Sequence, residues 1–397
     1  MTPLVLGHYT ATTCVGPGLA PLEAALRAGR GGLAPCTFES VDLDICAGEV
    51  AGIDAERLPA ALAAFDCRNN RLAQLALRQD GFAEAVRAAV ARLGRARVGL
   101  FLGTSTSGIL ETEIAYRHRD AVTGALPSAF RYLGSHSAFS VAAFVRELFG
   151  IEGPAAVVAT ACSSSAKVFG SAQRMIEAGI IDAALVGGVD SLCLTTLYGF
   201  HSLQLTARGP CRPFALDRDG ITVGEGAAFA LLERPGPAAG PSSVALLGVG
   251  ESSDAYHLSS PHPDGLGARL AMDAALTAAA LDPGQVDYLN LHGTATPSND
   301  RAESRAVIAA LGPAVPCSST KGATGHTLGA AGAIEAAISA LALARGFMPG
   351  GINTIDVDPA LGVHYLTRTR NVAPARVLSN SFGFGGTNCS LLFGRLG

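Results

Sequence analysis

Short apolar runs recur along the chain, and segments with helical spacing separate them. They read "RVGLFLGTST", "AAVVATAC", "AALVGGVD", "AAFALLER", "SVALLGVG", "VDYLNLHGTA", "VPCSST" and "RVLSNSFGFGG". Runs that are apolar at consecutive positions predict strands buried on both faces, and strands that alternate with helices predict an α/β protein. We therefore expect largely buried sheets covered by helices.

A proline- and glycine-rich stretch, "ERPGPAAGPSS" at residues 233–243, is typical of a surface connection. The strand, glycine and polar loop of "PLVLGHYTATTCVGPG" return after it as "SVALLGVGESSDAYH", and "AAFALLER" has a counterpart in "CSLLFGR" near the end. At 397 residues the chain also exceeds the usual size of one core. We expect two similar halves, residues 1–235 and 236–397.

Charge and cysteine content exclude several classes. The net charge of -4, with no basic cluster, argues against a nucleic-acid surface. The nine cysteines include no CxxC pair, so we expect no metal site and a reducing cytoplasm. The start of the chain lacks the pattern of a signal peptide. "TLGAAGAIEAAISALALARG" contains Glu335 and is dominated by alanine and glycine, which predicts a buried helix and no membrane span.

The stretch "VVATACSSSAKVFG", residues 157–170, places Cys162 between an apolar run and three serines that favour a helix start. At such a turn the free backbone N–H groups and the helix dipole favour thiolate over thiol, from an ordinary pKa of about 8.5. A dipole contributes only ~0.3 to 2 kcal/mol, so a further partner is needed. The alternative is a packing role, because most unpaired cysteines are small buried hydrophobes.

Two histidines lie in glycine-rich contexts after the proline-rich connection. His292 follows an apolar run in "LNLHGTATPSND", and His326 lies five residues after Lys321 in "SSTKGATGHTLGAAGAIE". Each alone is more typical of a structural histidine, but both together with a strand-end cysteine indicate a catalytic set. The loop "NSFGFGGTN" predicts a backbone that can approach a ligand and point N–H groups at an oxyanion; the alternative is a tight turn.

Seven stretches together resemble the elongating β-ketoacyl-acyl carrier protein synthases of the thiolase superfamily. They are "TACSSSAKV", "GGVDS", "CRPFALDRDGITVGEGAAFALLE", "SDAYHLSSPHPDG", "HGTATPSND", "SSTKGATGHTLGAAGAIE" and "NSFGFGGTN", in the order of the family and over essentially the whole chain. The resemblance implies a thiolase-like, five-layered αβαβα fold built from two similar halves. It also implies a dimer, with the active site where the halves meet.

The resemblance assigns the central roles. Cys162 would be the acyl-accepting nucleophile, His292 and His326 the paired histidines, and Lys321 with Glu335 a supporting pair. The acyl group would pass from a carrier thioester to Cys162, a malonyl thioester would lose carbon dioxide, and the resulting enolate would attack the Cys162 thioester. If each histidine supplies a donor of ~3 to 4 kcal/mol, losing either should slow decarboxylation by roughly 10² to 10³ fold while acylation of Cys162 continues.

The resemblance also implies roles around the entrance. The backbone N–H groups of Cys162 and Phe384 would form the oxyanion hole, and Phe384 would gate the second substrate. Thr294 and Thr296 would contact the phosphopantetheine arm of the substrate, and Gly385 would also belong to the substrate-binding residues. The acidic residues Asp300 and Glu303 would be structural.

Rival members of the superfamily fit less well. The initiating synthases carry asparagine in place of one histidine, and a degradative thiolase would need a second cysteine in a late glycine-rich motif. Cys389 follows the "GFGGTN" loop, so we expect it to pack. A non-catalytic chain-length-factor-like subunit would lack Cys162, but such a relative could be a partner in a heterodimer; a homodimer is the alternative.

The partner that delivers substrate is expected to be a separate, acidic acyl carrier protein, and no cofactor is expected within the chain. In "FDCRNNRLAQLALRQ", Arg68 and Arg71 share a helical face and are similar to the carrier-docking region of the family; an ordinary solvated face is the alternative. The same stretch and "LYGFHSLQLT" look more like aryl-polyene ketosynthases than housekeeping fatty-acid enzymes. That resemblance implies a wider acyl pocket, lined partly by residues 103–113.

Overall fold

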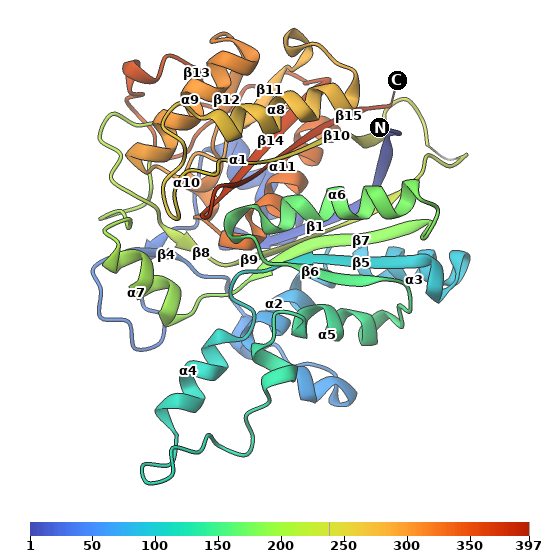
Figure 1. Cartoon of the computed structure of the whole chain (residues 1–397), viewed down its shortest axis with the longest axis vertical. Helices are drawn as coiled ribbons and strands as arrows, with labels where there is room; N and C mark the ends of the chain where they lie inside the picture. The colour runs from blue at the N-terminus through green and yellow to red at the C-terminus, as the bar shows by residue number, and fades with distance from the viewer. Residues whose placement is uncertain (238, 397) are drawn as a thin grey trace.

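The computed structural model describes residues 1–237 and 239–396, in which strands and helices alternate as expected (Figure 1). The principal elements of the first half are β1 (Leu4–Thr13), α2 (Arg68–Leu77), α3 (Phe82–Leu93), β5 (Val98–Gly103), α4 (Ile109–Arg117), α5 (Ser140–Phe149), β6 (Ala155–Val158), α6 (Ser164–Glu177), β7 (Ala183–Asp190), α7 (Leu194–Ser202) and β9 (Gly226–Glu233). Those of the second half are β10 (Val244–Ser253), α8 (Leu266–Ala279), β11 (Tyr288–Asn290), α9 (Pro297–Leu311), β12 (Pro316–Ser318), α10 (Lys321–Thr324), α11 (Ala331–Arg345), β14 (Arg376–Gly383) and β15 (Thr387–Arg395).

The strands of the two halves follow the same spatial order. The first half runs β1-β9-β7-β5-β6 and the second runs β10-β15-β14-β11-β12. If the five strands of each half are numbered along the chain, both orders read 1-5-4-2-3. Parallel and antiparallel pairings also agree one by one. The expected duplication is confirmed, including the correspondence of β1 with β10 and of β9 with β15.

Helices cover both faces of each half, which gives the five layers expected (Figure 1). Apolar residues of α2, α3 and α5 pack on one side of the first half, and those of α8 and α9 pack on the outer side of the second. Helices α6 and α11 lie between the halves and share one core with strands of both. Strands β5 and β7 are buried at every residue because helices cover both of their faces.

The alanine-rich stretch forms the central helix α11, buried from Ala331 to Leu343. The 18-residue stretch Leu328–Arg345 is apolar enough to cross a membrane, but 89% of it is buried within the protein. It is therefore a core helix. The expected surface connection lies between the end of β9 and the start of β10, which pairs antiparallel with β1 and so joins the halves.

Two features of the first half remain exposed. Strand β6 forms one edge of the sheet. Helix α4 and the following segment project from the body as an arm (Figure 1). The large apolar side chains exposed along this arm are those of Tyr116, Val122, Tyr132 and Leu133.

Candidate active site

Cys162 sits at a sharp turn between a strand and a helix, as the sequence predicts. Strand β6 ends at Val158, a single 3₁₀ turn spans Ala161–Ser163, and α6 begins at Ser164. Ala161 has a φ of 52°, a left-handed conformation that costs energy for a residue with a Cβ atom. The turn therefore presents Cys162 at the start of α6.

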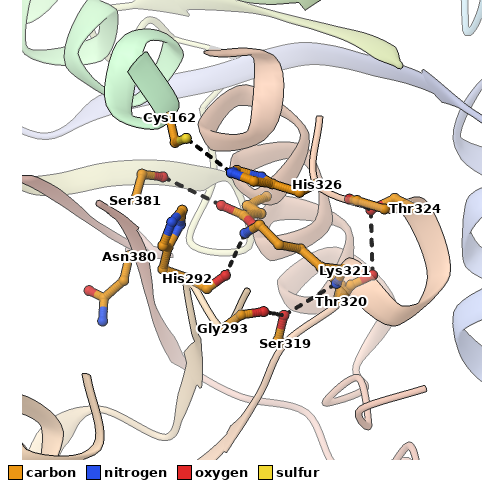
Figure 2. A network of polar contacts seen from close by, with 12 residues as sticks. Cys162, His292, Gly293, Ser319, Thr320, Lys321, Thr324, His326, Asn380 and Ser381 are labelled. Atoms are coloured by element: carbon orange, nitrogen blue, oxygen red, sulfur yellow. Dashed lines mark hydrogen bonds and ion pairs between the residues drawn. The ribbon is translucent and has the colours of Figure 1, made fainter. Parts of the chain in front are cut away.

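The two predicted histidines meet Cys162 from the other half of the fold. His292 follows β11, and His326 lies between α10 and α11. Nε2 of His326 lies 3.0 Å from the sulfur of Cys162, as Figure 2 shows. The two imidazole rings are 5.4 Å apart and nearly perpendicular. All three side chains are buried, so the structure brings the predicted triad together between the halves.

The resting state of Cys162 differs from the expectation based on its position. Burial raises the pKa of the thiol to about 12, although the nearby cation of Lys321 and the backbone N–H of Phe384 lower it. Desolvation of the thiolate therefore outweighs the groups that stabilise it, so the turn alone does not ionise Cys162 and the further partner expected from the sequence is required. The thiol holds its proton until a base takes it.

His326 is placed to be that base. Burial is the largest cause that lowers the pKa values of His292 and His326 well below 6.5, and the charge of Lys321 lowers both further. Both imidazoles are consequently neutral near pH 7. The Nδ1 atoms of both are buried and have no hydrogen-bond partner among the described residues, whereas Nε2 of His326 contacts the thiol directly.

Lys321 and Glu335 form a buried ion pair, and Lys321 lies close to His292 and His326 (Figure 2). Nζ of Lys321 also donates to the His292 carbonyl at 2.6 Å, and the Ser381 hydroxyl donates to Glu335 at 3.4 Å. Burial raises the pKa of Glu335, while Lys321 lowers it. The pair thus ties α10, α11, β14 and the His292 loop together and places a positive charge near the thiol.

Asp300 and Glu303 act on the backbone. Glu303 accepts from the N–H groups of His292 and Gly293, each at 2.8 Å, and so fixes the loop that carries His292. Asp300 accepts from the N–H of Phe214 at 2.9 Å. Burial raises the pKa of Asp300 to about 6 and that of Glu303 to about 7. These contacts agree with the structural role expected for both.

A cleft leads from the surface to Cys162. It is lined by Phe200, Asp254, Ser259, Thr294, Thr296, Phe384, Gly385 and other residues of both halves. Phe384 is 39% exposed, and its ring lies 6.0 Å from that of Phe200. The hydroxyls of Thr294 and Thr296 lie 3.0 Å apart. Three side chains and one glycine expected near the substrate therefore share one cleft.

The loop 383–387 is the turn between β14 and β15, so the alternative of a tight turn holds as well. Gly385 and Gly386 have φ values of 84° and 76°, where other residues are strained. The Phe384 N–H in this turn lowers the pKa of the Cys162 thiol. The tight turn therefore also carries the N–H group that the resemblance assigns to the oxyanion hole.

Asp190, at the end of β7, is a residue that sequence reasoning overlooked. Its carboxylate accepts from the Ser105 and Thr106 N–H groups at 2.7 and 2.8 Å and from the Ala330 N–H at 3.2 Å. It therefore fixes the loop after β5 and the start of α11 beside Cys162. The motif "GGVDS" contains this aspartate. A carboxylate at the end of a buried strand is the sequence signal that could have identified Asp190.

The expected docking role of Arg68 is wrong. Its side chain is buried, and its guanidinium contacts the fully buried Glu225 at 2.7 Å and Asp54 at 2.7 Å. A cation held inside by a buried carboxylate cannot meet a partner's acidic surface. Arg71 is partly exposed but pairs with Asp66 through two contacts of 2.7 Å, so the two arginines do not form a shared basic face.

The described residues offer no set of metal ligands. Among residues 1–237 and 239–396, no group of three or more His, Cys, Asp or Glu side chains is arranged to hold a metal ion. All nine cysteines are unpaired.

Two domain families match the chain. "Beta-ketoacyl synthase, N-terminal domain" matches residues 68–238, and "Beta-ketoacyl synthase, C-terminal domain" matches residues 244–354. The mitochondrial 3-oxoacyl-acyl carrier protein synthase of Arabidopsis thaliana is 40% identical over 62% of this chain and 57% of its own length. The 3-oxoacyl-acyl carrier protein synthase 2 of Synechocystis sp. is 32% identical over 98% of this chain and 97% of its own. A solved structure of the ketosynthase ApeO in complex with its chain length factor ApeC, from Xenorhabdus doucetiae, aligns with a TM-score of 0.89 and 37% identity, covering 99% and 98% of the two chains.

Proposed function

This chain belongs to the β-ketoacyl synthase family, and we propose that it extends an acyl group held on Cys162 by two carbons from malonyl-acyl carrier protein. The observation that carries this proposal is the contact of Cys162 with His326, beside His292, at the inner end of a cleft. The family supports the reaction class, and the geometry supports the assignment of roles.

In the first step the sulfur of Cys162 attacks the carbonyl carbon of an acyl thioester. His326 takes the thiol proton through the 3.0 Å contact. The N–H groups of Cys162 and Phe384 stabilise the oxyanion. When the tetrahedral intermediate collapses, the bond to the carrier sulfur breaks, and the proton passes from His326 to the departing thiol. The acyl group is then held on Cys162.

In the second step malonyl thioester enters and its carboxylate leaves as carbon dioxide. The electrons of the broken C–C bond form an enolate, whose oxygen receives hydrogen bonds from the neutral histidines. The enolate carbon attacks the Cys162 thioester, a new C–C bond forms, and the Cys162 sulfur departs. One proton from solvent restores the thiol. The product is a β-ketoacyl thioester two carbons longer.

The carrier protein is proposed to dock around the mouth of the cleft. Arg208 and Arg301 are both exposed and have no ion-pair partner among the described residues. Arg208 lies three residues from Leu205, and Arg301 lies two residues from Asn299; both neighbours line the cleft. An acidic carrier would approach these free cations with its phosphopantetheine arm directed between Thr294 and Thr296 toward Cys162.

A dimer is proposed through the exposed edge of the first half. Strand β6 leaves backbone groups unpaired at the sheet edge, and the apolar side chains of the arm lie in the same half. A second copy or a chain-length-factor-like relative would cover both. The complex of ApeO with a chain length factor makes the heterodimer the arrangement to test first.

The pathway is proposed to be aryl-polyene elongation in the cytoplasm, with fatty-acid elongation as the alternative. The variable stretches at residues 65–77 and 197–206 support the aryl-polyene pathway. The unpaired cysteines suit a reducing compartment.

Intact mass spectrometry tests the proposal. The purified protein, alone and with a co-expressed relative, is incubated with saturated and polyunsaturated aryl acyl carriers and then with malonyl carrier. An acyl adduct on Cys162, followed by a carrier product longer by two carbons, is expected. The preferred acyl group decides between the two pathways. Absence of any adduct, with every acyl group and with the relative present, contradicts the proposed function.

A further inference from the structure

Three hydroxyl groups connect the turn that carries Cys162 to the turn that carries Phe384. The Ser163 hydroxyl lies 3.1 Å from that of Thr160 and 2.9 Å from that of Thr387, and the Thr387 hydroxyl donates to the Thr160 carbonyl at 3.1 Å. Ser163 is fully buried. We propose that these hydroxyls, the "hydroxyl clasp", are positioning groups that hold the two oxyanion donors, the Cys162 and Phe384 N–H groups, at a fixed spacing.

Every hydroxyl proton of the clasp has an acceptor. The Thr387 hydroxyl donates to the Thr160 carbonyl at 3.1 Å, and Thr160 can donate to Ser163 at 3.1 Å. The single proton of the Ser163 hydroxyl can go to the Thr160 carbonyl at 2.9 Å or to the Thr387 hydroxyl at 2.9 Å. Removing the Thr387 hydroxyl deletes both of its contacts with the Cys162 turn, to the Ser163 hydroxyl and to the Thr160 carbonyl, although Ser163 still reaches that carbonyl within its own turn. The contact sets Thr387 against Ser163 although 224 residues separate them.

The clasp reaches the oxyanion donors through short, stiff connections. Ser163 is bonded to Cys162, and Thr387 pairs with Gly383 at the base of the turn that holds Phe384. Gly383 lies against the clasp so closely that a Cβ atom there would be 2.6 Å from the Thr160 carbonyl oxygen and 2.9 Å from the Thr387 hydroxyl. The backbone at Gly383 therefore lies directly against the turn that carries Cys162.

Residues 254–258, at the mouth of the cleft, bind the opposite side of the loop that carries Phe384. The Gly385 N–H donates to the Leu258 carbonyl at 2.7 Å, and the Asp254 N–H donates to the Gly386 carbonyl at 2.8 Å. Residues 254–258 and the hydroxyl clasp thus hold the Phe384 loop from two sides. On the Cys162 side the clasp is what sets the loop's distance from the nucleophile.

The inference rests on the proposed acyl transfer, and isosteric variants test it. Thr387→Val keeps the shape and removes the hydroxyl, Thr387→Ser keeps the hydroxyl, and Ser163→Ala removes the second hydroxyl. Ser171→Ala, on the same helix but bonded only to the Lys167 carbonyl, is the control. For Thr387→Val and Ser163→Ala we expect acylation and condensation to slow together by about 10- to 100-fold, less than the loss of a whole oxyanion donor. KM should be nearly unchanged, and Thr387→Ser should retain the rate.

A second readout separates oxyanion geometry from general damage. Alkylation of Cys162 by iodoacetamide forms a thioether and releases iodide without an oxyanion, so its rate in Thr387→Val should match the parent even where thioester transfer is slow. Three results would each overturn the clasp. The thioester-transfer rate could fall equally in Thr387→Val and Thr387→Ser, or the alkylation rate of Thr387→Val could fall as much as its transfer rate. The transfer rate of Thr387→Val could also stay within twofold of the parent rate. If the parent itself forms no adduct, the proposed function has failed instead.

Discussion

The sulfur of Cys162 lies 3.0 Å from Nε2 of His326, and both residues are buried at the inner end of the cleft. Because burial raises the pKa of the thiol to about 12 and lowers that of the imidazole, the contact joins a protonated thiol to a neutral base. His292 stands beside this pair without touching the sulfur. The two histidines are therefore not equivalent.

Substituting the histidines one at a time should reveal this difference. His292→Ala should still acylate Cys162 at nearly the parent rate but condense about 10² to 10³ times more slowly, because a donor to the enolate is lost. His326→Ala should slow both steps, which departs from the expectation from sequence that either variant acylates normally. Single-turnover mass spectrometry of the Cys162 adduct measures acylation directly. Equal acylation rates in the two variants would contradict a base role for His326.

The pH dependence of acylation follows from the lowered pKa of His326. Protonation would disable the base, but since the pKa lies well below 6.5, the rate should stay constant as the pH falls from 8 to 6.5 and decline only below that. With the thiol pKa near 12, no increase is expected near pH 8.5. Stopped-flow measurement with acyl-pantetheine avoids titration of the carrier. A decline of the acylation rate with a midpoint at or above pH 6.5 would show that the His326 imidazole is not desolvated.

The buried ion pair should dominate stability in its neighbourhood. Lys321→Met leaves Glu335 charged and unpaired in the core, and we expect a loss of about 3 to 5 kcal/mol in the free energy of unfolding. The double variant Lys321→Met with Glu335→Gln removes both charges and should recover much of that loss. Denaturant unfolding measures both. Equal stability of the single and double variants would mean that the two charges are not coupled.

Carrier docking should depend on the free arginines at the cleft mouth. Charge reversal at Arg208 or Arg301 should raise KM for acyl carrier substrates about five- to tenfold with little change in kcat. Arg71→Glu should have no such effect, since Arg71 is already paired with Asp66. Acyl-pantetheine, which lacks the carrier, is the control and should be used equally well by all variants. A KM increase confined to Arg71→Glu would place the docking site elsewhere.

Assembly should depend on the edge strand. Ala156 is exposed in β6. If two such edges pair, the substitution Ala156→Glu brings two negative charges together at the interface. We expect light scattering to show a monomer, or loss of a co-expressed relative, at micromolar concentration. Leu270→Glu, at an exposed apolar residue of α8, is the matched control. An Ala156→Glu protein that assembles normally would exclude β6 from the interface.

Sequence reasoning identified the alternation of strands and helices, the two halves and the catalytic triad, because these follow from local patterns and motif order. It erred where burial decides. The helix start predicts a lowered pKa for Cys162, but the surrounding layers remove water and raise it. Arg68 has the spacing of a surface residue, yet Glu225, 157 residues away in the sequence, draws it inward. Such long-range pairings have no local signature.

The shared strand order of the halves gives the active site a hidden pseudo-symmetry. Cys162 follows the third strand of its half in chain order, and Lys321 and His326 follow the third strand of theirs. The nucleophile and its base thus occupy equivalent positions around an approximate twofold axis. Two identical subunits would have to place the same side chain at both positions. Joining the halves in one chain allows each copy to diverge, so that one supplies the sulfur and the other supplies the imidazole.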